Sequence, residues 1–289
     1  MKEKNNMKKK AGKRFFKRLF HRKIVLFGTA LVVLFVLLAL AAPLVSPYDP
    51  YAVDPVHMWE KPSAEHWLGT DNVGRDVLSR MIYGSRTSLL IGIVAVALSA
   101  AVGIVLGLVS GYLGGVVDAV ISRAMEALMA IPNTMFALCL GLLLGGGLVN
   151  LMIILGISTL PSYTRMMRGQ VISIKSSDFV LAEQVLGARR RRIMFSHILP
   201  NCLSPLIVMI TRNIGGAILA ESGLSFLGLG IDAPMASWGG MVNDGYVKLL
   251  SNPVFGLAPG ICILLLVLGF NILGDGLRDV LDPRLRGTM

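Results

Sequence analysis

The feature that most constrains this chain is a series of long apolar segments with few or no charges. The first, residues 24–45, has no charged residue at all. An α-helix rises about 1.5 Å per residue, so a segment of this length crosses the ~30 Å hydrocarbon core of a bilayer. Further apolar segments lie at residues 89–109, 118–144, 148–163, 203–219 and 254–273. They predict an all-α integral membrane protein with six transmembrane helices.

Composition and charge support this class. The chain is 54% hydrophobic and 16% charged, which is too apolar for an ordinary soluble domain. Its net charge of +11 does not indicate a nucleic-acid partner, because apolar segments separate the basic residues. Residues 1–23 hold eleven Lys or Arg and the single acid Glu3, which predicts a basic tail that lies on anionic lipid. A secretory signal is the alternative, but the apolar run that follows is too long for one.

The distribution of basic residues predicts the topology. A cytoplasmic tail 1–23 places the first span at 24–45 and an extracytoplasmic loop at 46–86. The core domain 87–276 then has an inner loop at 175–201 and an outer loop at 221–253, before a cytoplasmic tail at 277–289. Only five Lys or Arg fall in the two outer loops, whereas the inner segments and their flanks collect most of the others. This asymmetry follows the positive-inside rule.

Residues 175–201 form the longest polar interruption between two apolar segments. A short helix is expected from Asp178 to Leu186, capped by Ser177 or Asp178, followed by a tight turn at Gly187 and a new apolar pattern. This predicts an elbow at a membrane surface. The simplest alternative is an amphipathic interfacial helix with a solvated arginine run.

The elbow resembles the cytoplasmic coupling loop of ABC importer membrane subunits, usually written EAA…G…LP. The resemblance lies in Ala182, Glu183, Leu186, Gly187 and Ala188 and in the closing ILPN at residues 198–201. It implies that an ATPase subunit binds this loop. The residues in contact with the ATPase would be Leu181, Ala182, Glu183, Leu186, Gly187, Ala188 and Arg189. The chain departs from the family where Leu181 replaces the leading Glu and Glu183 replaces the second Ala, so the charge moves about 200° round the helix.

Two predicted outer segments indicate which group of ABC importer subunits the chain resembles. The first contains Asp71, Gly74, Arg75 and Asp76; the second contains SFLGLGI at residues 225–231 and then Trp238 within SWGGM. Both resemble the C-type, binding-protein-dependent permease of dipeptide, oligopeptide and nickel importers. The residues themselves predict a helix from about Asn72 capped by Asp71, with Arg75 paired to an acid such as Asp71. A catalytic or metal-binding pair of acids is the alternative.

Polar residues inside the predicted spans are candidates for a pathway or gate. Pro132 should kink the third span, either for gating or as a packing bend. Arg212 lies within the fifth span, where it could attract a peptide carboxylate or pair with a neighbouring helix. The short apolar stretch 226–231 suggests a re-entrant or interfacial element.

The chain shows no sign of being an enzyme. It contains no GxxxxGK[ST], HExxH or GxSxG motif, and its four histidines and three cysteines lack metal-ligand spacing. We therefore expect no catalytic residue, no metal site and no cofactor bound by this chain.

The family resemblance also implies the other subunits of the transporter. It implies a permease subunit in a bacterial or archaeal plasma membrane, with a second homologous permease subunit and an extracytoplasmic substrate-binding protein. One or two cytoplasmic ATPase subunits would use ATP and Mg²⁺. The expected cargo is a dipeptide or oligopeptide, with nickel or a metal chelate as the alternative. An ion-coupled secondary transporter is a hypothesis from another class, with Asp118, Glu126 and Arg212 as a charge relay.

Overall fold

The computed structural model describes residues 19, 20 and 22–281, and within them the regular secondary structure is helical apart from one isolated bridge between Thr70 and Asp76. The long helices are α2 (Lys23–Val45), α3 (Val77–Leu113), α6 (Leu148–Lys175), α9 (Leu199–Phe226) and α11 (Pro253–Leu281). The shorter ones are α4 (Gly115–Met129), α5 (Asn133–Leu144), α7 (Asp178–Val185), α8 (Arg190–Arg192), α10 (Trp238–Tyr246), the 3₁₀ turn η1 (Pro55–His57) and the π-helical turn η2 (Ile193–Ile198). This confirms the predicted all-α class.

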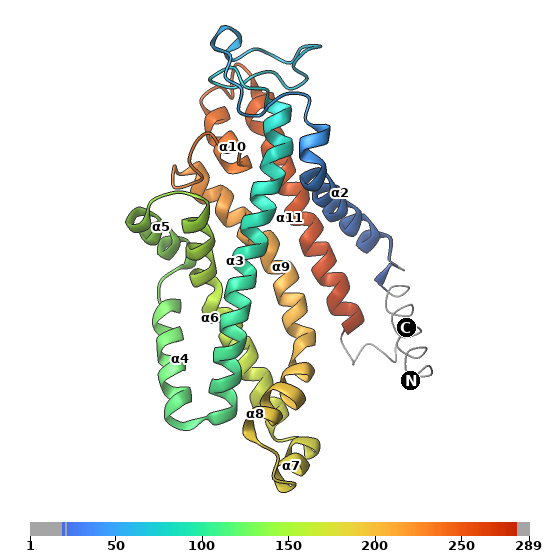
Figure 1. The fold of residues 1–289 in the computed structure, drawn as a ribbon, viewed down its shortest axis with the longest axis vertical. Helices are drawn as coiled ribbons and strands as arrows, with labels where there is room; N and C mark the ends of the chain where they lie inside the picture. Colours follow the sequence, from blue (N-terminus) through green and yellow to red (C-terminus); the bar gives the residue numbers. More distant parts are fainter. Residues whose placement is uncertain (1–18, 21, 282–289) are drawn as a thin grey trace.

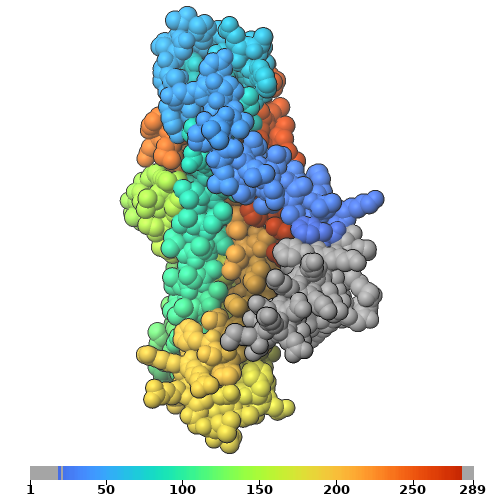
Figure 2. All heavy atoms as spheres, turned by 45° about the vertical axis from the view of Figure 1, so that its right-hand side comes forward, coloured from blue at the N-terminus to red at the C-terminus, as the bar shows by residue number. Residues whose placement is uncertain are grey.

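The molecule is elongated (Figure 1). The helices α3, α6, α9 and α11 run along the long axis, with α2 beside α11, and α10 lies at one end. Figure 2 shows the segment between α2 and α3 covering that end, while the segment of α7, α8 and η2 forms the opposite end. The two predicted classes of loop therefore occupy opposite ends of the bundle.

Four of these helices are long and apolar enough to cross a membrane: α2, α3, the continuous stretch Arg190–Phe226 and α11. The bent pair α4–α5 would bring the number to five if it counts as one span. α6 has 28 residues and two arginines, and it is not among these candidates. The number of six spans therefore stays a prediction.

The third predicted span is not one kinked helix, because α4 and α5 meet at 85°. α4 ends at Met129 and α5 begins at Asn133, with Pro132 in an extended conformation (ψ 132°) between them. Proline has no N–H to donate and disfavours helical geometry in the residue before it. The expected kink is in fact a break that separates two helices.

Several predicted helix ends differ from those in the structure. α3 begins at Val77 and not at Asn72, so the predicted outer loop 46–86 ends in a helix. α6 and α9 extend well past Tyr163 and Leu219, and residues 227–229 form the turn that closes α9. A re-entrant or interfacial role for residues 226–231 stays a prediction. Helices continue through charged flanks because the backbone hydrogen bonds do not depend on apolar side chains.

Small residues let α3 and α6 approach closely. A methyl group built on Gly103 would lie 2.6 Å from Cβ of Tyr163, and one on Gly107 would lie 2.4 Å from the carbonyl oxygen of Thr164. Gly111 faces Val171 one further turn along. Such spacing by four residues is typical of close helix packing in membranes.

Candidate functional site

The tip formed by α7 is fixed to the bundle on one side. Ser177 is the N-cap residue as predicted, but its hydroxyl donates a hydrogen bond to the carbonyl of Ile174 and not to the new helix. Val180 is fully buried in an apolar cluster that includes Met167 of α6 and Ile193 and Ile198 of η2. The tip is therefore packed against α6 and against η2, which leads into α9.

The other side of the tip is exposed and apolar. Leu181 and Val185, one helical turn apart, are 46% and 87% exposed, and Leu186 is 81% exposed. Gly187 turns the chain in the left-handed region (φ 75°), and the amide of Ala188 donates back to the carbonyl of Glu183. Ala182 and Arg189 are also exposed, so the predicted coupling residues form one protruding surface; Glu183 and Ala188 are half-buried.

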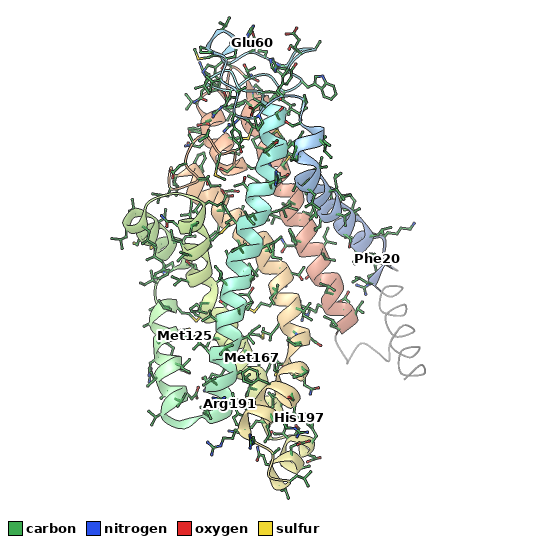
Figure 3. All side chains as sticks on the ribbon, viewed as in Figure 1. Phe20, Glu60, Met125, Met167, Arg191 and His197 are labelled. Carbon is green, nitrogen blue, oxygen red and sulfur yellow. The ribbon has the colours of Figure 1, made fainter. Side chains whose placement is uncertain are left out.

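Charge surrounds this surface. Arg189 and the three arginines of α8 are all exposed, and Figure 3 shows Arg191 and His197 at this end of the molecule. Glu183, the acid displaced from its family position, lies 3.6 Å from Nε2 of His197. This contact joins α7 to η2 and is one that sequence spacing did not predict.

An apolar cavity of about 470 Å³ opens between α5, α6 and α9. Its lining carries no charged residue, and its polar groups are amides and hydroxyls, among them Asn133, Thr159 and Asn213. The amide of Asn213 donates to the hydroxyl of Tyr163 at 3.0 Å. We call this space the apolar cavity.

The two predicted gating residues lie outside the lining of the apolar cavity. Pro132 is exposed at the break before α5, directly next to the lining residue Asn133. Arg212 is half exposed, and its guanidinium lies 3.7 Å from Asp275 of α11. That contact corresponds to the pairing alternative for Arg212, whereas a role in the pathway stays a prediction.

The Asp71 motif folds differently from the prediction. Asp76 caps α3 by accepting a hydrogen bond from the amide of Ser79 at 2.7 Å, so the expected capping by Asp71 is wrong. Asp71 instead accepts from the amides of Val73 and Arg75, and Nε of Arg75 donates to it at 2.6 Å. The expected Asp71–Arg75 pair is therefore present and buried.

Two further residues of the motif are explained by close packing. Gly74 has φ 81°, and a Cβ there would lie 1.7 Å from the carbonyl oxygen of Asp54. Trp238, the first residue of α10, is buried, and its indole N–H donates to the carbonyl of Met81 at 2.9 Å. The two predicted outer segments thus pack against each other.

Sequence reasoning missed two contacts inside the helical region. Asp118 of α4 makes a bidentate pair with Arg168 of α6, at 2.6 Å to both Nε and Nη2, instead of approaching Arg123. Glu221 of α9 is fully buried and accepts from the hydroxyl of Ser225 at 2.7 Å. The residues of the first pair are 50 positions apart, so no local pattern could have revealed it. The described residues contain no group of three or more His, Cys, Asp or Glu that could hold a metal ion.

Comparison with solved structures supports the architecture. The chain resembles a chain of the MetNI methionine ABC transporter in an inward-facing conformation, with a TM-score of 0.58 over 70% of this chain and 96% of that one. Sequence identity is 16%, so this likeness concerns the fold alone.

Two family models and several relatives match the sequence. Residues 103–287 match the binding-protein-dependent transport system inner membrane component, and residues 11–62 match the N-terminal transmembrane domain of oligopeptide transport permease C. A dipeptide transport system permease protein of Alkalihalophilus pseudofirmus is 42% identical over 94% of this chain and 89% of its own length. An oligopeptide transport system permease protein of Bacillus subtilis is 39% identical over 91% of this chain and 87% of its own length. A glutathione transport system permease protein of Escherichia coli is 36% identical over 94% of this chain and 90% of its own length. The chain belongs to the family of binding-protein-dependent transport system inner membrane components, and its relatives are permease subunits of ABC importers.

Proposed function

We propose that this chain is the membrane-spanning permease subunit of an ATP-driven importer that takes up dipeptides or oligopeptides. The cargo is inferred from relatives named for dipeptide and oligopeptide transport. An extracytoplasmic binding protein would deliver the peptide to the end that contains α10. ATP and Mg²⁺ would be used by one or two separate ATPase subunits, and a second homologous permease subunit would complete the pathway.

The observation that most supports this proposal is the shape of the α7 tip. One side of α7 is fixed by Val180 between α6 and η2, which leads into α9, while Leu181, Val185 and Leu186 are left exposed. Exposed apolar clusters of this kind mark protein contacts. A partner that moves the tip therefore also moves two long helices that line the apolar cavity.

The charge pattern supports the proposed orientation. Arg189 and the arginines of α8 lie at the α7 end, together with Arg165 and Arg168 in the last turns of α6. Under the positive-inside rule this is the cytoplasmic end. Both termini would then be cytoplasmic, and the α7 tip would face the compartment that contains ATP.

Affinity purification of the tagged protein from its native membrane in mild detergent tests the assembly. We expect a second permease subunit and ATPase subunits to co-purify. The docking surface is tested by Leu186→Asp, which puts a charge on an exposed position and should leave the fold intact. We expect ATPase recovery to fall by about tenfold or more, as for a central contact residue.

Leu250→Asp is the matched control, because Leu250 is equally apolar, fully exposed and close to α10 at the opposite end. It should not change ATPase recovery. Normal ATPase recovery and peptide uptake with Leu186→Asp would refute the docking surface. Repeated purification of the wild-type chain alone, in a state active in ion-driven uptake, would refute the importer.

A further inference from the structure

A second, polar cavity lies at the α10 end of the molecule. It has a volume of about 210 Å³ and is bordered by the start of α3, the turn that follows α9, and α10. Its charged lining residues are Arg75, Arg80, Asp232 and Asp244. An engineered cavity of about 150 Å³ admits benzene, so this space has room for a small organic molecule.

The two arginines in this cavity are buried and share one acid. The side chains of Arg75 and Arg80 are 9% and 6% exposed, and Nε of each lies within 3.3 Å of the same carboxylate oxygen of Asp71. Nη1 of Arg80 donates to the carbonyls of Pro50 and Pro234. Both Nη atoms of Arg75 lack a hydrogen-bond partner within residues 22–281. The same is true of the Nη2 atom of Arg80.

Asp244 is left without a partner in the same cavity. It is half-buried on α10, and its carboxylate makes no hydrogen bond or ion pair with any described residue. Burial raises the pKa of this carboxyl, while the charge of Arg80 opposes that rise. A half-buried carboxylate without a direct partner is partly desolvated, so a cationic group bound in the cavity would stabilise its charge.

Among the described residues, the arginines and the acids that line this cavity form no ion pair with one another. Two guanidinium groups share the single acid Asp71, which leaves an excess positive charge around the arginines, whereas Asp244 and the exposed Asp232 add negative charge and have no ion-pair partner among the described residues. No nitrogen of either arginine lies within 4.0 Å of the Asp244 carboxylate. The complement of this arrangement is a small zwitterion with its carboxylate and ammonium groups apart. An inorganic anion would satisfy only the arginines.

The polar cavity is next to the apolar cavity. Leu224 and Leu227 of the α9 end line the apolar cavity, and Ser225 and Gly228, adjacent in sequence, line the polar one. A molecule in the polar cavity is therefore held beside the space between α5, α6 and α9.

We propose that the polar cavity binds the backbone of a dipeptide, with its carboxylate on Arg75 and Arg80 and its ammonium group on Asp244. This inference rests on the proposed function, because it assumes that peptides pass through the protein. It adds a peptide-binding site on the permease itself, separate from the binding protein. A longer peptide cannot place both of its ends in a cavity of this size.

The test measures binding of dialanine to the assembled importer, purified in detergent without its binding protein. Three probes are compared by calorimetry: dialanine, N-acetyl-dialanine and dialanine amide. We expect dialanine to bind and each blocked form to bind about tenfold more weakly, as for the loss of one charge-assisted contact. Asp244→Asn should weaken dialanine about tenfold and leave N-acetyl-dialanine unchanged, because the acetylated form no longer has the ammonium group.

Glu65→Gln is the matched control, since Glu65 is an exposed acid in the loop that covers the same end, outside the cavity. It should leave all three affinities unchanged. Equal weakening of dialanine and N-acetyl-dialanine by Asp244→Asn would overturn the assignment, and so would wild-type protein that imports peptides but does not bind dialanine. If Asp244→Asn does not assemble, the three probes on the wild type decide the question. Failure of the wild-type importer to take up any peptide would overturn the proposed function and this site with it.

Discussion

Alanine in place of Gly107 would place a methyl group 2.4 Å from the carbonyl oxygen of Thr164 and 2.7 Å from Cβ of Met167. Ordinary contact for a Cβ atom begins at 3.4 Å, so α3 and α6 would have to separate locally by about 1 Å. The nearest atom belongs to the backbone and cannot rotate away. We therefore expect a cost of about 3 kcal/mol, at the upper end of the range for overpacking.

A second effect partly offsets this cost. Alanine has a higher helix propensity than glycine by about 1 kcal/mol, so the net loss expected for Gly107→Ala is about 2 kcal/mol. Gly169→Ala is the matched control, because Gly169 lies on α6 and a Cβ there meets no atom within 4 Å. That variant should be as stable as the wild type or up to about 1 kcal/mol more stable.

The free energy of unfolding of both variants can be measured by titration with dodecyl sulfate in mixed micelles. A difference of about 3 kcal/mol between Gly107→Ala and Gly169→Ala is expected. Equal stability of the two variants would refute the close contact between α3 and α6, because both would then show only the same gain in helix propensity.

Two more predictions concern ion pairs. For Asp118 and Arg168, a double-mutant cycle with Asn and Gln should give a coupling of about 1 kcal/mol in unfolding free energy, because the bidentate pair is only partly exposed; the exposed pair of Arg123 and Glu126 should give a value near zero. Equal couplings would contradict this difference in environment. For Arg212→Leu, we expect less than about 1 kcal/mol of destabilisation, since the residue is half exposed and its acidic partner on α11 is 3.7 Å away. A change in uptake per folded molecule would then support a role in the pathway, whereas loss of folded protein alone would refute it.

Much of the fold followed from the apolar pattern, because a bilayer requires long uncharged helices. The first span, predicted at 24–45, is α2 at Lys23–Val45, and the last, predicted from 254, is α11 starting at Pro253. The prediction failed at Pro132, where the pattern is apolar on both sides of a break of 85°. Hydropathy describes the surroundings of a segment, but the direction of the backbone depends on local torsions that an average over residues does not contain.

The predictions for the site residues were also partly right and partly wrong. The pair of Asp71 and Arg75 follows from a spacing of four residues, and the structure contains it. The sequence did not predict that this pair lies in a turn and that Asp76 caps α3. Aspartate is a good N-cap residue at either position, so only the packing of the folded chain decides which of the two acids is the cap. The pairing of Asp118 with Arg168, and the cavity that brings Arg75 near Asp244, join segments far apart in the sequence.

These distant contacts suggest how the α7 tip could affect the apolar cavity. α6 leads into α7 through only two residues, 176 and 177, and Arg168, two turns before the end of α6, holds Asp118 of α4. α4 has no buried residue of its own, so its position depends on this pair, on the hydrogen bond that Asp118 accepts from Ser110 of α3, and on its neighbours at the break before α5. α5 in turn lines the apolar cavity. A partner that displaces the tip would therefore act on α4 in part through this ion pair, and weakening that pair should reduce uptake more than ATPase binding.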